Sequence, residues 1–181
     1  MERKTIFVVL TYQCFKLYFI NMKKIISVII LALFFISCEE DVVFNSPSIQ
    51  GKLDNVFWRA IDSEALLDEN GGLTITGFGR KQKMILHTSS KNKGIYVLGN
   101  STARYANFES DIDGTLLIYS TGKDIGGDGQ IEITEFDSNK GTVSGTFRFN
   151  AINNENNPLG GEILNFNQGV FYKIPVIGLT D

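Results

Sequence analysis

One acidic, glycine-rich segment has residue types spaced as in a calcium-binding loop. Asp124, Asp128 and Glu135 stand at positions one, five and twelve of such a loop, with Gly129 at position six. Carboxylate oxygens are ligands that Ca²⁺ prefers. Position three is Gly126, however, and the segment leads into alternating residues that predict a strand rather than a helix. The pattern is therefore also that of a hairpin turning at Asp128-Gly129, with calcium binding as the alternative.

Residues for nucleophilic or acid–base chemistry are few. His87 is the single histidine, and the two cysteines are Cys14 and Cys38. A lone histidine in an apolar strand is more typical of a packed side chain than of a catalyst, and no G-x-S-x-G motif is present. Glu132 and Glu135 fall on opposite faces of one predicted strand, so they do not form a local acid–base pair. We therefore expect no enzymatic activity and no cofactor.

The elements that would position these residues follow an N-terminal targeting segment. From Met22, two lysines precede the charge-free stretch Ile25 to Ile36, and Ser37-Cys38 then leads into three acidic residues. A positive start, an apolar stretch shorter than the about 20 residues of a membrane helix, and a small residue before the cleavage point are typical of a secretory signal. The cysteine makes residues 22–37 resemble a lipoprotein signal peptide, which implies that Cys38 is acylated and becomes the first residue of the mature chain.

The segments before and after the predicted signal peptide differ in composition. Residues 1–21 fit neither a membrane span nor a signal, so we expect that translation starts at Met22 and that they are an upstream extension. Residues 38–48 predict a tether that is acidic at first and then polar. The acids after Cys38 resemble the surface-export signals of Bacteroidetes lipoproteins. We therefore expect a protein that is lipid-anchored in a bacterial outer membrane, on its periplasmic side or at the cell surface.

The charge of the mature chain excludes one class of partner. The full sequence carries 17 Lys+Arg and 20 Asp+Glu, with a net charge of −3. Most of the charge before Cys38 is basic, so the chain becomes more acidic once the signal is removed. A nucleic-acid-binding protein needs a basic surface instead. The expected partners are the membrane, through the anchor at Cys38, and a glycan or an envelope protein.

The rest of the chain, residues 49–181, has the pattern of an all-β domain. Apolar residues alternate in about nine or ten short segments with hairpin-length connections, which predicts a single antiparallel β-sandwich or flattened barrel. Residues 49–61 predict a hairpin turning at Asp54-Asn55, and residues 62–70 predict one helical turn. The clearest strand runs from Thr142 to Ile152. Its expected inward face holds Val143, Gly145, Phe147, Phe149 and Ala151.

Most of the aromatic side chains of residues 38–181 are expected to lie in the core. Phe57 and Trp58 are adjacent in one predicted strand, so one of the two should enter the core. Aromatic rings left on the surface of a sheet are able to stack on sugar rings. Tyr105, Tyr119 and Tyr172 are the first candidates for such binding, and packing against neighbouring strands is the favoured interpretation of these rings.

Four stretches carry a family resemblance. They are Asp54–Ala60 (DNVFWRA), Gly129–Thr134 (GQIEIT), Val143–Ala151 (VSGTFRFNA) and Asn167–Phe171 (NQGVF). In these stretches the chain resembles small Bacteroidetes lipoproteins grouped as DUF6252, a domain of unknown function. The resemblance implies a β-rich, lipidated envelope protein with no established activity and no catalytic residues to carry over.

Two functions remain open after this reading. The first is a non-catalytic binding or interaction module, whose ligand-binding residues the sequence leaves unknown. It predicts a wide concave surface with converging polar groups and exposed aromatic rings. The alternative is a structural or accessory envelope lipoprotein without a small-molecule ligand, which predicts a packed core and no sizeable pocket.

Overall fold

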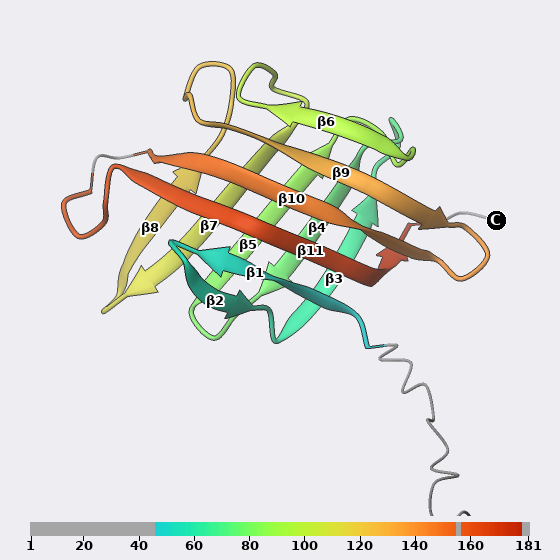
Figure 1. The fold of residues 1–181 in the computed structure, drawn as a ribbon, viewed down its shortest axis with the longest axis horizontal. Coiled ribbons are helices and arrows are strands. Elements are labelled where there is room, and N and C mark those ends of the chain that lie inside the picture. The colour runs from blue at the N-terminus through green and yellow to red at the C-terminus, as the bar shows by residue number, and fades with distance from the viewer. Residues whose placement is uncertain (1–45, 155–156, 179–181) are drawn as a thin grey trace, which may run out of the picture. The chain divides into compact units, whose positions relative to one another are not determined.

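The computed structural model describes residues 46–154 and 157–178, and these ranges fold into an all-β domain (Figure 1). Its 11 strands are β1 (Ser48–Leu53), β2 (Val56–Arg59), β3 (Asp62–Leu67), β4 (Leu73–Phe78), β5 (Gln82–Thr88), β6 (Gly94–Leu98), β7 (Tyr105–Ile112), β8 (Thr115–Ser120), β9 (Asp128–Asp137), β10 (Thr142–Asn153) and β11 (Ile163–Ile177). No helix in the described part of the chain is long and apolar enough to cross a membrane. The predicted upstream extension, the signal peptide, Cys38 and most of the tether lie outside the described residues.

The strands form two facing layers. The front layer has the order β6-β9-β10-β11-β1-β2, and the back layer has the order β3-β4-β5-β7-β8. The layers join at two corners, where the end of β11 pairs with β3 and the end of β10 pairs with β8. Figure 1 shows the front layer lying across the back layer, with the strands of the two layers running in different directions. This arrangement confirms the predicted sandwich or flattened barrel.

Two details of the prediction were wrong. Residues 62–67 form strand β3 instead of a helical turn, with Ser63 and Ala65 buried and their neighbours exposed. Pairing with β4 along the whole of β3 outweighs the weak local preference for a helix. The sheet is also not wholly antiparallel, because Val176-Ile177 pair in parallel with Ala65-Leu66. A parallel pair needs a long connection, and here the intervening strands of the domain provide it.

The first hairpin follows the predicted turn. Asp54 and Asn55 both have positive φ, 47° and 68°, which is the backbone conformation of a type I′ turn. Asn and Asp tolerate this conformation better than other non-glycine residues. The turn leaves Trp58 only 7% exposed, whereas Phe57 is 67% exposed on the opposite face. The expectation that one of the two rings enters the core is thus confirmed.

The core lies between the two layers and combines aliphatic side chains with a cluster of aromatic rings. All five residues predicted for the inward face of β10 are buried. The ring of Phe166, from β11, is fully buried and lies at the centre of this packing. Its centroid is between 5.4 and 6.1 Å from the ring centroids of Trp58, Phe108, Phe147 and Phe149. Both layers therefore pack against this one side chain, because Phe108 comes from β7 of the back layer.

Candidate functional site

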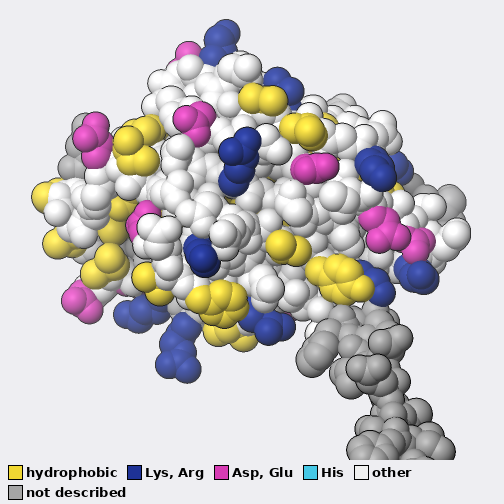
Figure 2. All heavy atoms as spheres, in the orientation of Figure 1, with side chains coloured by type: hydrophobic (Ala, Val, Ile, Leu, Met, Phe, Trp, Pro, Cys, Tyr) yellow, Lys and Arg dark blue, Asp and Glu magenta, His cyan; other side chains and the backbone are white. Residues whose placement is uncertain are grey.

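The outer face of the front layer, which is turned away from the core, carries two adjoining hollows. Their volumes are about 440 and 340 Å³, and both are lined by Gln130 and Arg148. The side chains that line the first hollow include Asn150, Asn165 and Asn167. Figure 2 shows charged side chains of both signs and hydrophobic side chains scattered on this face among backbone and uncharged polar side chains. The hollows are within the size range of small-ligand sites.

Four polar side chains join strands β9, β10 and β11 across the first hollow, and we call them the amide ladder. Asn167 Nδ2 donates to Asn165 Oδ1 at 2.8 Å, and Asn165 Nδ2 donates to Asn150 Oδ1 at 2.7 Å. Asn150 Nδ2 in turn donates to Asp128 Oδ1 at 2.8 Å. The strand register aligns these groups, because Asn150 is the Cα partner of both Asn165 and Asp128.

The carboxylate at the end of the amide ladder fixes its direction. An ionised Asp128 only accepts hydrogen bonds, so Asn150 must present its NH₂ group to it. The oxygen of Asn150 is then left to accept from Asn165, and the same reasoning orients Asn165 toward Asn167. Each ladder amide is therefore held in one orientation by its neighbours. A pre-oriented set of donors and acceptors loses little conformational entropy when a ligand binds.

The backbone around Asn165 and Asn167 is also held in place. The Asp54 carboxylate accepts a hydrogen bond of 2.9 Å from the N–H of Asn165, and the N–H of Asp54 donates back to the Asn165 carbonyl at 2.8 Å. Next to Asn167, Gln168 has a φ of 51° and lies at a break in the β10–β11 register. Such a bulge re-aims the side chains beside it. Here it places Gln168 at the second hollow.

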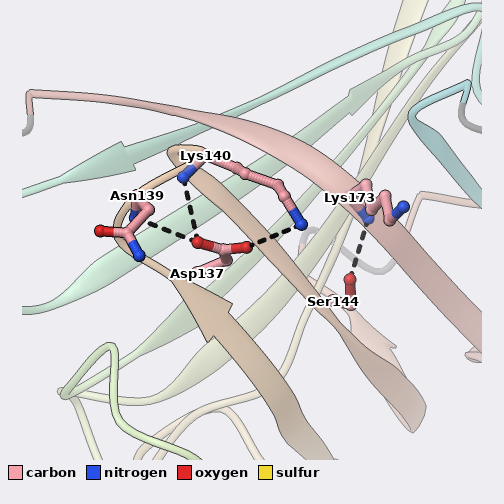
Figure 3. Close-up of polar contacts among 5 residues, drawn as sticks. All are labelled: Asp137, Asn139, Lys140, Ser144 and Lys173. Atoms are coloured by element: carbon pink, nitrogen blue, oxygen red, sulfur yellow. Dashed lines mark hydrogen bonds and ion pairs between the residues drawn. The ribbon is translucent and has the colours of Figure 1, made fainter.

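The backbone at a second bulge in β11 is held by a hydrogen bond to a buried hydroxyl group. Lys173 has a φ of 47°, and its N–H donates to Ser144 Oγ at 3.0 Å (Figure 3). The β10–β11 register shifts at this point, so the hydroxyl takes the place of a missing strand partner. Ser144 is 7% exposed, although the alternation of β10 places it on the outward face.

The β9–β10 hairpin that carries Gln130 and Arg148 ends in a turn closed by Asp137. The Asp137 carboxylate accepts from the N–H groups of Asn139 and Lys140, each at 3.0 Å, and the Lys140 ammonium lies 3.3 Å away (Figure 3). The hydrogen bond from the Lys140 backbone is the largest of the influences that lower the pKa of Asp137. The turn is therefore strengthened by the ionised form of this carboxyl group.

Exposed apolar groups stand at both margins of the outer face. At one margin Phe57 of β2 is the Cα partner of Lys52, which is the partner of Asn167. At the other margin the β6 side chains Ile95 and Val97 are 58% and 47% exposed. Directly opposite residues in a sheet point to the same side. The amide ladder thus lies between an aromatic ring and two aliphatic side chains on one surface.

The strands that form this site match a known domain family. The profile of a family described as a domain of unknown function, DUF6252, matches residues 45–175. The chain belongs to this family. A search of the curated proteins finds no match, and a search of the solved structures finds none either.

The DUF6252 match covers the whole of the candidate site. It begins before β1 and ends within β11, so it includes Phe57, both hollows and the amide ladder. The site is therefore built from the strands of the DUF6252 domain itself.

The residues predicted as calcium ligands are not brought together. Asp128 is the first residue of β9 and belongs to the amide ladder, whereas Glu135 lies further along the same extended strand. At about 3.3 Å per residue their Cα atoms are on the order of 20 Å apart. Asp124 lies in a separate loop, in which Gly122 and Gly126 bond to each other. Within residues 46–154 and 157–178, no three His, Cys, Asp or Glu side chains are grouped as a metal site.

The turn predicted at Asp128-Gly129 was wrong. Both residues lie inside β9, and the tight turn is formed earlier, between Gly122 and Gly126. Gly129 has a φ of 132°, and a Cβ atom there would lie 2.2 Å from the Arg148 carbonyl oxygen. This position needs glycine because the β10 backbone approaches it, and not because the chain reverses there.

The three tyrosines singled out from the sequence lie in three different settings. Tyr119 is 6% exposed and is part of the core, so it is not available for sugar stacking. Tyr172 is half-buried on the outer face of the front layer. Tyr105 lies on the back layer, where it lines a hollow of about 440 Å³ together with Asn107 and Lys123. An exposed ring on the outer face is instead Phe57, which is separated from Asn167 of the amide ladder by Lys52 and which the sequence indicated only as a core candidate.

His87 lies on the back layer, away from the amide ladder. Its Nδ1 is 2.9 Å from Thr74 Oγ1, and its ring stacks on Tyr105 with centroids 4.9 Å apart. Burial lowers the pKa of His87, and this effect outweighs the opposite influence of the Asp68 carboxylate.

The lowered pKa of His87 predicts a pH dependence of stability. The unfolded chain binds the proton more readily than the folded chain, so the free energy of unfolding should fall as the pH drops below about 6.5. Urea unfolding of the wild type at pH 7.5 and 5.5 should show this loss, and His87→Gln should show a smaller one. Equal losses in both proteins would exclude His87 as the cause.

Proposed function

We propose that this protein is a lipid-anchored, non-catalytic binding module of the bacterial envelope, of the kind found in Bacteroidetes, whose ligand binds to the outer face of the front layer. The observation that carries the proposal is the amide ladder, in which Asn167, Asn165, Asn150 and Asp128 are bonded in series beside a hollow of about 440 Å³. Polar side chains that form such a series on a surface are displayed to solvent in a fixed pattern. That pattern is what a site for hydrogen-bonded recognition requires.

The anchor in this proposal is Cys38. The support is the order of the N-terminal residues, in which a short apolar stretch ends at Ser37-Cys38 and acids follow. The first described strand begins at Ser48, ten residues after the cysteine. Ten extended residues reach at most about 35 Å, so the tether would hold the domain close to the outer membrane.

The absence of catalysis in this proposal is supported by the charged groups of the site. In the lining of the two hollows, Asp128 and Arg148 are the charged side chains. Hydrolysis of a glycosidic bond in most enzymes needs a pair of carboxyl groups, one as acid and one as base or nucleophile. A single carboxylate that already accepts from Asn150 does not provide that pair.

The structural or accessory lipoprotein is the second candidate. Its support is the well-packed aromatic core around Phe166. It predicts no sizeable pocket, however, and the two hollows of the outer face together with the oriented amides favour the binding module.

Cosedimentation with isolated cell-envelope material tests the binding module. The mature chain carrying Cys38→Ala is used, so that the lipid does not mask binding by the domain. Asn150→Ala removes two bonds of the amide ladder and should weaken binding roughly tenfold, equivalent to about 1.4 kcal/mol. Asn107→Ala, in the hollow of the back layer, is the matched control and should bind as the wild type does. Equal binding by the wild type and Asn150→Ala would contradict the proposal.

A further inference from the structure

We infer that the outer face of the front layer takes an uncharged polysaccharide chain that lies across the strands, with the ring of Phe57 stacking on a sugar. This inference rests on the proposed function and names its ligand class. Three features of the surface carry it, namely its hydrogen-bonding groups, its charge and its apolar margins.

The hydrogen-bonding groups match those of hydroxyls. A primary amide has two N–H donors and an oxygen with two lone pairs. Asn165 and Asn150 each use one donor and one lone pair within the amide ladder, so each keeps one donor and one lone pair for a ligand. A sugar hydroxyl is itself both a donor and an acceptor. The ladder therefore offers paired partners for successive hydroxyl groups.

The charge of the site favours an uncharged ligand. The lining of the two hollows contains one carboxylate, on Asp128, and one guanidinium, on Arg148. Both already bond to neighbouring amides, since Arg148 Nη2 donates to Gln130 Oε1 at 3.1 Å and Asp128 accepts from Asn150. An anionic chain would meet the Asp128 carboxylate. A cationic chain would meet the Arg148 guanidinium and, between Phe57 and Asn167, the Lys52 ammonium. A ligand without charge avoids electrostatic repulsion from any of these groups.

The apolar margins fit the apolar faces of sugar rings. Phe57 is 67% exposed at the β2 edge, and Val97 is exposed at the β6 edge. With neighbouring strands about 4.8 Å apart, these two margins of the front layer are about 24 Å from each other. That span accommodates several sugar units in a row. A flat aromatic ring at one end would hold a sugar by stacking, while the amides between bind hydroxyl groups.

A peptide is a poorer match to this surface. Extended peptides are usually bound along the edge of a sheet, where unpaired backbone groups are available, and helices are bound in apolar grooves. The amide ladder lies on β9, β10 and β11, which are interior strands of the front layer and have partners on both sides. Its central groups are polar rather than apolar.

Affinity electrophoresis with defined polysaccharides tests the inference. The mature chain carrying Cys38→Ala is run through gels containing dextran, mannan or xylan, and through gels containing the anionic polymer polygalacturonate. We expect at least one neutral polysaccharide to retard the protein, with polygalacturonate having a weaker effect. Phe57→Ala and Asn167→Ala should each raise the dissociation constant about tenfold. Tyr105→Ala, in the hollow of the back layer, should leave it unchanged.

A second arm separates this inference from the proposed function. Periodate oxidation cleaves the vicinal diols of sugars, so envelope material treated with periodate should no longer sediment the protein. Binding to treated material that still depends on Asn150 would overturn the polysaccharide inference and leave the binding module standing. The inference would also be overturned by the absence of retardation in all three neutral gels, or by a loss of binding in Tyr105→Ala but not in Phe57→Ala.

Discussion

Phe166→Ala is expected to lower the free energy of unfolding by about 4 kcal/mol, within the range of large-to-small substitutions at buried aromatic residues. Phe166 is fully buried, and its ring contacts rings from both layers of the domain, including Trp58 and Phe108. Removing the ring leaves a cavity between the two layers. The strands on both sides are fixed by their hydrogen bonds, so they cannot move together to fill it. The change should be measured as a lower midpoint of urea unfolding with an unchanged slope.

Phe57→Ala is the matched control for this experiment. It removes the same number of atoms from a side chain that is 67% exposed, so its effect on the free energy of unfolding should be within about 0.5 kcal/mol. A loss of less than about 1 kcal/mol in Phe166→Ala would show that the two layers do not depend on this contact. A large loss in Phe57→Ala would show that this ring is structural rather than available to a ligand.

The chain from residue 38 carrying Cys38→Ala, exported with a cleavable signal peptide of the non-lipoprotein type in place of residues 1–37, is expected to move completely from the membrane fraction to the soluble fraction. Each acyl CH₂ buried in the bilayer contributes about 0.8 kcal/mol, so several chains on one cysteine hold a protein stably and their loss releases it. Intact-mass spectrometry of the membrane-extracted wild type should show a chain that starts at an acylated Cys38. Cys14→Ala is the control and should change neither the mass of the mature chain nor its location.

One result would contradict the proposal that Cys38 anchors the protein. A membrane-bound wild type that retains Met22 or earlier residues and carries no lipid would mean that the N-terminal segment itself holds the protein in the membrane. The proposed binding surface would then remain without the lipid anchor, because the amide ladder is formed by residues of the described domain.

Local patterns in the sequence were sufficient to predict several elements. The alternation in residues 142–152 identified the inward face of β10, because a strand shows its two faces at every second residue. The turn at Asp54-Asn55 was predictable because few residue pairs tolerate two successive positive φ angles. The class of the domain followed from the absence of segments long enough for crossover helices.

Features that depend on long-range pairing were not predictable in this way. The corner between β3 and β11 joins residues near 65 and 176, and no local pattern indicates that pairing. The amide ladder has the same origin, because Asp128, Asn150 and Asn165 meet only through the registers of two strand pairs. One signal was nevertheless present. Asn is disfavoured in strands, so its repeated occurrence at outward positions of β10 and β11 indicates a role other than strand formation.

The register shifts of β11 were also hidden from the sequence. Gln168 and Lys173 have positive φ angles although neither is a glycine, and both lie in a segment that reads as one regular strand. Such positions cost free energy and are retained where the surrounding structure needs them. At Gln168 the bulge lies at the second hollow, which connects the irregular backbone to the candidate site.

The central claim is that the ligand binds to the amide ladder, and nuclear magnetic resonance tests it most directly. The ¹⁵N-labelled mature chain with Cys38→Ala is titrated with polysaccharide solubilised from the cell envelope. We predict that the side-chain NH₂ signals of Asn150, Asn165 and Asn167 shift together, whereas that of Asn107 on the back layer does not. Shifts confined to Asn107 and its neighbours, with the ladder signals unchanged, would contradict the account.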